Sequence, residues 1–303
     1  MKQQNIVVIG SSNTDMVIRS SHLPVPGETV LGGSFMMNPG GKGANQAVAA
    51  AKLGGAVTFV ARLGKDVFGQ EALAAWQELG MQTEFIVTDA ENPSGVAVIL
   101  VDQKGENCIS VALGANAALD IEDVDRAADA IQSAAYMLLQ LEVPMAAVAH
   151  AAQLAKQNAT KVVLNPAPAQ ALSDELLDGL NIITPNQSEA ELLTGIPVND
   201  QSSAAQAASA LRQKGVEIVI ITMGSQGAYV QSEELDELIP APLVKTVDTT
   251  AAGDTFNGAL VVALAEGQPL REAIRFANAA AAYAVTQPGA QASTPLRHQI
   301  ISV

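Results

Sequence analysis

The chain has 303 residues, of which 49% are hydrophobic and 16% are charged, so it can bury a sizeable core and is not a disordered chain. Sixteen basic and 31 acidic residues give a formal net charge of −15, which argues against nucleic acid or an anionic membrane as the main partner. One cysteine, Cys108, excludes an internal disulfide, and no run reaches the ~18 apolar residues of a membrane helix. We expect a soluble, cytoplasmic protein.

The first predicted strand is the apolar run NIVVIGS, from Asn5 to Ser11, which is typical of a strand buried on both faces. The glycines of a dinucleotide-binding motif do not follow it, so a dehydrogenase is disfavoured. Asn13 and Asp15 follow instead, at the edge where open α/β sheets bind ligands. The alternative is that both are plain turn residues.

A glycine-rich turn comes next, in the stretch NPGGKGANQ that leads into a helix of small residues ending near Leu53. It is not a Walker A motif, because Gly43 follows the lysine where Ser or Thr is required. We expect the turn to bring Gly41, Lys42 and Asn45 against a small polar ligand. A helix start with merely flexible glycines is the alternative.

A small second sheet is predicted outside the main one, within about residues 14–38 and 94–113. Residues 29–31 and 34–37 have the pattern of short edge strands, and residues 95–102 and 107–113 that of a β-hairpin. These segments carry more apolar side chains than one covered face can hide. The small sheet is therefore expected to cover the ligand, a partner subunit, or both.

The rest of the chain alternates strands and helices, which predicts a doubly wound, mostly parallel α/β sheet with helices on both faces. No linker or repeat divides it, so we expect one domain over residues 1–303. Glu142, Asn186, Glu189 and Gly224 each lie just beyond a predicted strand. Because the carboxyl ends of parallel strands share one edge, these residues are expected to meet Asn13 and Asp15 there.

The C-terminal stretch DTTAAGDTFNG, from Asp248 to Gly258, precedes an apolar run that predicts a buried helix. The small residues Ala251, Ala252 and Gly253 fall where that helix should begin, so their N–H groups would attract an anion. A carboxylate, Asp254, follows at once. It is suited to taking a proton from a nucleophile that attacks phosphate, although it could also be a helix cap.

Two of these stretches, NPGGKGAN and DTTAAGDTF, resemble the N- and C-terminal signatures of the PfkB sugar kinases, in their ribokinase branch. The resemblance extends from Asn5 to about Pro295. It implies a doubly wound α/β domain with a small β lid that pairs with the lid of a second subunit. The implied reaction is phosphorylation of the 5-hydroxyl of D-ribose by ATP with Mg²⁺.

The resemblance also implies roles for individual residues. Sugar binding would involve Asn13, Asp15, Gly41, Lys42, Asn45 and Glu142, and Asp254 would be the catalytic base, with Ala252 and Gly253 stabilising the transferred phosphoryl group. Asn186 and Glu189 would order Mg²⁺ near the phosphates. The nucleotide would be held by Thr222, Gly224, Ser225, Gly227, Gly253 and Asn278. A K⁺ site would be formed by Asp248, Thr250, Ala284, Gln287, Gly289 and Ser293.

Ala251 stands where many relatives carry glycine, and we expect it in a helical or bridge conformation because a positive φ would strain it. Other readings stay open at this point. The same fold could act on 2-deoxyribose, a nucleoside or another sugar, although few aromatic residues are available to hold a base. A catalytically silent sugar-binding regulator is the alternative from another class, and Asp254 argues against it.

Overall fold

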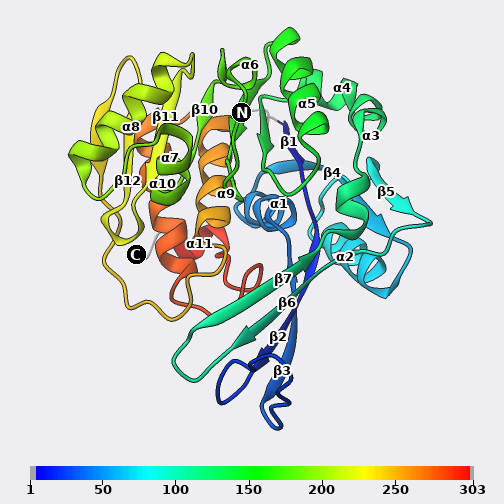
Figure 1. Cartoon of the computed structure of the whole chain (residues 1–303). Coiled ribbons are helices and arrows are strands. Elements are labelled where there is room, and N and C mark those ends of the chain that lie inside the picture. Colours follow the sequence, from blue (N-terminus) through cyan, green and yellow to red (C-terminus); the bar gives the residue numbers. More distant parts are fainter. Residues whose placement is uncertain (1–4, 301–303) are drawn as a thin grey trace.

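The structure is a computed structural model that describes residues 5–300. A large sheet with helices on both faces forms the body, and a small sheet projects from it (Figure 1). The strands are β1 Asn5–Ile9, β2 Asn13–Arg19, β3 Ser34–Gly40, β4 Ala56–Gly64, β5 Ile86–Asp89, β6 Gly95–Val101, β7 Asn107–Ala112, β8 Tyr136–Leu139, β9 Lys161–Leu164, β10 Ile182–Ile183, β11 Ile218–Thr222, β12 Ala228–Gln231 and β13 Asp236–Ile239.

The α-helices alternate with these strands over most of the chain, as predicted. They are α1 Lys42–Lys52, α2 Val67–Glu78, α3 Ile121–Arg126, α4 Ala128–Ser133, α5 Met145–Gln157, α6 Asp174–Leu177, α7 Gln187–Thr194, α8 Gln201–Gln213, α9 Ala252–Ala265, α10 Leu270–Ala284 and α11 Arg297–Ile300.

The large sheet has the order β13-β12-β11-β10-β9-β8-β1-β4-β5 and is parallel except at β12, which runs antiparallel to both neighbours. β1 lies inside it and is buried on both faces. Its side chains alternate between two cores: Ile6 and Val8 pack with α1, α2, α9 and α10, whereas Val7 and Ile9 pack with α3 to α8. The predicted doubly wound fold is confirmed.

The small sheet has the order β3-β2-β6-β7. The hairpin of β6 and β7 is where the sequence predicts it, and β3 extends the predicted strand at 34–37 to Gly40. Residues 29–31 are not a strand, which corrects the prediction: the chain there is exposed and turns through Gly32 and Gly33, both at positive φ. β2 begins at Asn13, so Asn13 and Asp15 lie in a strand of the small sheet rather than in a loop.

Helices α1 and α9 pack closely against each other and against the interior strand β1 (Figure 1). The contact needs a glycine: a Cβ on Gly258 would lie 2.6 Å from the Cβ of Ala49 and 2.8 Å from the carbonyl oxygen of Gln46. Such a separation is shorter than any ordinary contact. This contact, one turn after Asp254, holds the two helices side by side.

Candidate active site

Helix α9 begins at Ala252, as the small residues predict, but the residue before it has an unexpected conformation. Ala251 is at φ 57° and ψ 16°, in the left-handed region, so the expectation of a helical or bridge conformation is wrong. The turn around it is held by local hydrogen bonds: Thr250 donates its N–H to Asp248 Oδ1 at 2.9 Å, and Ala252 donates its N–H to the Thr249 carbonyl at 3.2 Å. This backbone conformation costs about 1–2 kcal/mol for a residue with a side chain.

Asp254 is the third residue of α9 and does not cap the helix, because Ala251 occupies the cap position. Its carboxylate is buried and accepts one amide hydrogen bond on each oxygen, from Gln46 Nε2 to Oδ1 and from Asn45 Nδ2 to Oδ2, both at 3.0 Å. Burial raises the pKa of Asp254, while the charge of Lys42 and these two amides act in the opposite direction.

Asp15 lies on β2 next to two other acidic side chains. Burial raises the pKa of Asp15 most, and the charges of Glu142 and Asp254 raise it further, to about 6. The positive charge of Lys42 offsets only part of this shift. Its carboxyl group lies against Gly40, where a Cβ would come within 2.5 Å of all three carboxyl atoms. The predicted sugar residues on β2, α1 and the β8–α5 loop therefore form one electrostatically coupled group.

The glycine-rich turn also takes the expected place. Gly41 precedes α1 at φ 87°, and a Cβ there would lie 2.7 Å from the backbone nitrogen of Asn13. Glu142 Oε2 accepts hydrogen bonds from the Lys42 N–H at 2.9 Å and from the Ser11 hydroxyl at 2.6 Å. The end of β1, the start of α1 and Glu142 are thus joined.

A cavity of about 200 Å³ lies in front of the N-terminus of α9. Asn186 and Glu189 line it and cap helix α7 reciprocally: Asn186 Oδ1 accepts the N–H of Glu189, and Glu189 Oε2 accepts the N–H of Asn186, both at 2.8 Å. Burial raises the pKa of Glu189. Two carboxylates, Glu189 and Asp254, line this cavity, and a site with one or two carboxylates suits Mg²⁺, which commonly keeps several of its water ligands.

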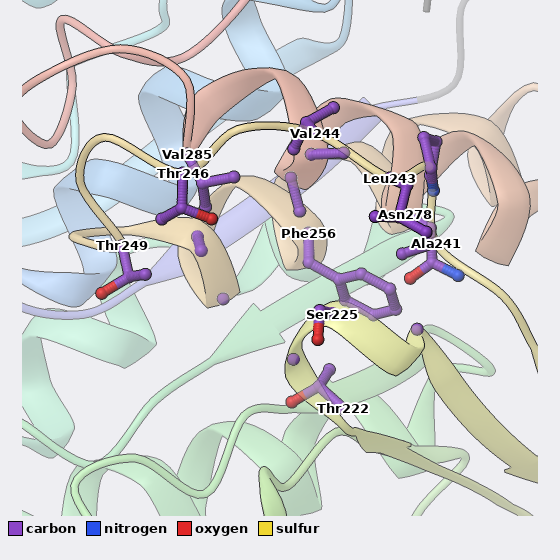
Figure 2. Close-up of a pocket in the computed structure, with 17 residues that line it drawn as sticks. Thr222, Ser225, Ala241, Leu243, Val244, Thr246, Thr249, Phe256, Asn278 and Val285 are labelled. Carbon is purple, nitrogen blue, oxygen red and sulfur yellow. The ribbon is translucent and has the colours of Figure 1, made fainter.

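A second cavity, of about 260 Å³, lies on the other side of the α9 N-terminus and is more apolar (Figure 2). It brings together the residues predicted for the nucleotide: Thr222, Gly224, Ser225, Gly227, Gly253 and Asn278. Asn278 also donates its amide to the carbonyl of Ile239 at 2.9 Å, so it fixes the loop that forms one wall. Leu243 and Phe256 supply apolar surface (Figure 2).

The two cavities meet at the start of α9. Four residues line both of them: Thr222, Thr249, Ala252 and Gly253. In an α-helix the first N–H groups have no carbonyl one turn back to bind. The N-terminus of α9 therefore presents donors where the cavities join, with Asp254 directly behind.

Of the six residues predicted for K⁺, five are joined by hydrogen bonds, in one group of three and one pair. Asp248 accepts from Thr250 on Oδ1 and from the N–H of Gly289 on Oδ2, the latter at 2.9 Å. Ala284 is the last residue of α10, and its carbonyl accepts the N–H of Gln287, three residues further on, at 3.0 Å. Ser293 is buried and donates its hydroxyl to the Ala290 carbonyl at 2.7 Å.

The sequence analysis missed a set of buried polar residues behind Asp254. They are Gln46 on α1, Asn257 on α9, and three residues that directly follow β8, β9 and β10, namely Gln140, Asn165 and Thr184. The signal was present: each of those three strands is an apolar run that ends in a polar residue. Asn116 is a further example, since its amide binds both Ser12 and Asn13.

Two features are absent from residues 5–300. No group of three or more His, Cys, Asp or Glu side chains there is arranged to hold a metal ion. In the same part of the chain, no helix combines the length and apolar character needed to cross a bilayer.

Comparisons with known proteins agree with this geometry. The family model described as pfkB family carbohydrate kinase matches residues 3–297. A ribokinase from Haemophilus influenzae is 46% identical over 299 residues, which cover 99% of this chain and 98% of that protein. A deoxyribokinase from Salmonella typhi is 37% identical, with 96% of this chain and 95% of that one covered.

The fold comparison gives the same family. The structure of Arabidopsis thaliana ribokinase, complexed with ribose and ATP, matches with a TM-score of 0.90 and 32% identity over 99% of this chain and 98% of that one. A match of the family model over nearly the whole length, joined to this fold, leaves one assignment: the chain belongs to the pfkB family of carbohydrate kinases.

Proposed function

We propose that the protein transfers the γ-phosphoryl group of ATP to the 5-hydroxyl of D-ribose, with Asp254 as the general base. The observation that carries this proposal is the position of Asp254, buried between two amide donors behind the point where the two cavities meet. Similarity to a ribokinase at 46% identity over nearly the full length of both chains supports ribose as the acceptor.

The proposed chemistry depends mainly on positioning, because phosphoryl transfer has a loose transition state. The sugar would lie against Asn13, Asp15, Gly41, Lys42, Asn45 and Glu142, with its hydroxyl facing Asp254. Asp254 would orient this hydroxyl and accept its proton. The N–H of Gly253 would stabilise charge on the transferred group; that of Ala252 would have to leave the Thr249 carbonyl first.

ATP would occupy the larger cavity, where Thr222, Gly224, Ser225, Gly227 and Asn278 form the walls. Its phosphates would extend toward the N-terminus of α9. Glu189, assisted by Asn186, would hold Mg²⁺ through water, and the ion would neutralise charge on the phosphates.

A deoxyribokinase activity is the second candidate, because the Salmonella typhi relative of that name matches almost the whole chain at 37% identity. The two sugars differ by one hydroxyl, so only one or two contacts need differ between the sites. A polar site that pairs with a hydroxyl discriminates strongly against a substrate that lacks it. On this ground we favour ribose.

The experiment that tests the function measures ADP release with a panel of pentoses, hexoses and nucleosides. We expect the highest kcat/KM with D-ribose, and a lower value with 2-deoxyribose. Asp254→Asn should lower kcat by at least ~10²-fold while sugar binding persists, because the general base is lost. A preference for 2-deoxyribose would favour the second candidate, and near-normal turnover in Asp254→Asn would remove this carboxylate from the chemistry.

We also propose a K⁺ site at Asp248, Thr250, Ala284, Gln287, Gly289 and Ser293, mostly through backbone carbonyls. The support is the turn at Asp248, which is joined to both Thr250 and Gly289 and lies directly before the strained Ala251. Oxygen ligands of this type suit hard cations. An ion there would fix the loop that aims the N-terminus of α9.

If so, K⁺ should give a higher turnover than Na⁺ at equal ionic strength, and Asp248→Ala should remove the difference. Initial rates in the two chloride salts make the measurement. Equal rates for the unchanged protein would mean that no such site acts here.

The small sheet is proposed to pair with that of a second copy, giving a homodimer. Apolar side chains are exposed on all of its strands, including Ile18 on β2, Phe35 and Met37 on β3, Val98 on β6 and Ile109 on β7. A patch of this kind commonly marks an interface, and two-fold pairing is the commonest form of assembly. Light scattering at micromolar concentration should give twice the 31.2 kDa chain mass; a monomeric mass would contradict the proposal.

The raised pKa of Asp15 predicts a pH dependence of sugar binding. With a pKa of about 6, Asp15 is mostly ionised at pH 7 and can only accept hydrogen bonds, whereas at pH 5 roughly a tenth remains ionised. Calorimetry without nucleotide should show D-ribose binding about tenfold more weakly at pH 5. Asp15→Asn should bind weakly at both values, and a wild-type affinity that does not change with pH would refute the role of Asp15.

The cytoplasm stays the predicted location. Cys108 is a free, exposed cysteine, which suits a reducing compartment.

A further inference from the structure

We propose that Gln46 is a positioning residue for the Asp254 carboxylate, and that it does so as the centre of a buried amide network built on the ends of β8, β9 and β10. This inference rests on the proposed role of Asp254 as the base. Gln46 is fully buried, and it donates from Nε2 both to Asp254 Oδ1 and to Asn165 Oδ1, each at 3.0 Å. Its Oε1 accepts from Gln140 Nε2 at 2.7 Å.

The orientation of each amide in this network follows from its partners. The Thr184 carbonyl can only accept, so Asn165 must turn its Nδ2 toward it, where the distance is 3.0 Å. Asn165 Oδ1 therefore faces Gln46. An ionised Asp254 can also only accept, so Gln46 must present its NH₂ group to both neighbours. The network is consistent only when Gln46 is a double donor beside a carboxylate.

The same network closes on the first turn of α9. Thr184 donates its hydroxyl to Asn257 Oδ1 at 2.7 Å, and Asn257 donates its amide to the carbonyl of Gly253 at 2.8 Å. Asp254 and the peptide that precedes it are thus tied to one buried framework. The framework is anchored on adjacent strands of the sheet, because β8 pairs with β9 and β9 with β10.

Gln46 differs from its neighbour Asn45 in that it has no unpaired polar atom left for a substrate. Asn45 donates to the other oxygen of Asp254, and its buried Oδ1 has no hydrogen-bond partner among residues 5–300, which leaves it one acceptor for a substrate group. Both polar atoms of Gln46 are already bonded to protein groups. Gln46 therefore acts through Asp254 and not on the substrate.

The physical effect is on the charge and direction of the base. Hydrogen bonds donated to a carboxylate favour its ionised form. The charged groups around Asp254 are Lys42 from α1, Asp15 from β2, Glu142 beyond β8 and Glu189 from α7, of which three repel a further negative charge. Burial and this repulsion both raise the pKa of Asp254, and the two amide donors act against them by stabilising the ionised carboxylate.

The test compares Gln46→Met, which keeps the size of the side chain but removes its donors, with Gln46→Glu, which places a carboxyl group against Asp254. We expect kcat at pH 7 to fall at least about tenfold in both, with KM for the sugar within about threefold of wild type. The acid limb of the kcat–pH profile should move up by about one pH unit or more, and further in Gln46→Glu. Gln77→Glu, on the exposed face of α2, is the control for added charge and should leave kcat and its pH profile unchanged.

Asn165→Ala provides a milder change, because it breaks the link behind Gln46 and leaves the bond to Asp254 in place. Its acid limb should move in the same direction by less. Melting temperatures identify any variant that fails to fold, and Asn165→Ala then carries the test. An unmoved acid limb in the folded variants would overturn the proposal, even if kcat fell. Activity retained in Asp254→Asn would instead refute the base itself, so the two failures are distinguishable.

Discussion

The close packing of α1 against α9 is the constraint on which the rest of the site depends. Gly258 lets the two helices approach until its backbone contacts the Cβ of Ala49. At that separation the amides of Asn45 and Gln46 bind one oxygen each of Asp254. A side chain at Gly258 would force the helices apart by about an ångström. Since N–H···O distances vary over only about 0.5 Å, a shift of this size would break the bonds to Asp254. Helix packing here sets the geometry of a carboxylate some four residues away.

A second consequence of that packing is that one helix end serves both cavities. The N-terminus of α9 offers N–H groups to each, and the turn that delivers the chain to it requires Ala251 in a left-handed conformation. Strain of this kind persists only where surrounding contacts determine the backbone, and it is common at functional sites. The hydrogen bonds of Asp248 and Thr249 supply those contacts.

Much of the fold followed from local pattern, because strands buried on both faces are continuous apolar runs and the segments between them alternate as helices. The residues brought to the sheet edge could be named since each followed such a run. Two features could not be predicted from local sequence: the backbone conformation of Ala251 and the role of Gln46. The φ of Ala251 belongs to a turn whose Asp248 is bonded to Gly289, 41 positions further along the chain. Gln46 has the sequence context of an ordinary helix residue. Its partners Gln140 and Asn165 lie 94 and 119 positions along the chain.

Strand β2 joins two parts of the molecule that would otherwise be independent. It carries Asn13 and Asp15 at its start and pairs along its whole length with β3 and β6, so these strands form one continuous hydrogen-bonded sheet. Seven residues of extended chain span about 20 Å. A tilt of about 10° at Asn13 would therefore displace the far end of β2, at Arg19, by about 3.5 Å. A shift of a fraction of an ångström around Asp15 would therefore become a larger displacement at the far end of the small sheet. In the same way, a contact that displaces the far end would change the position of Asp15.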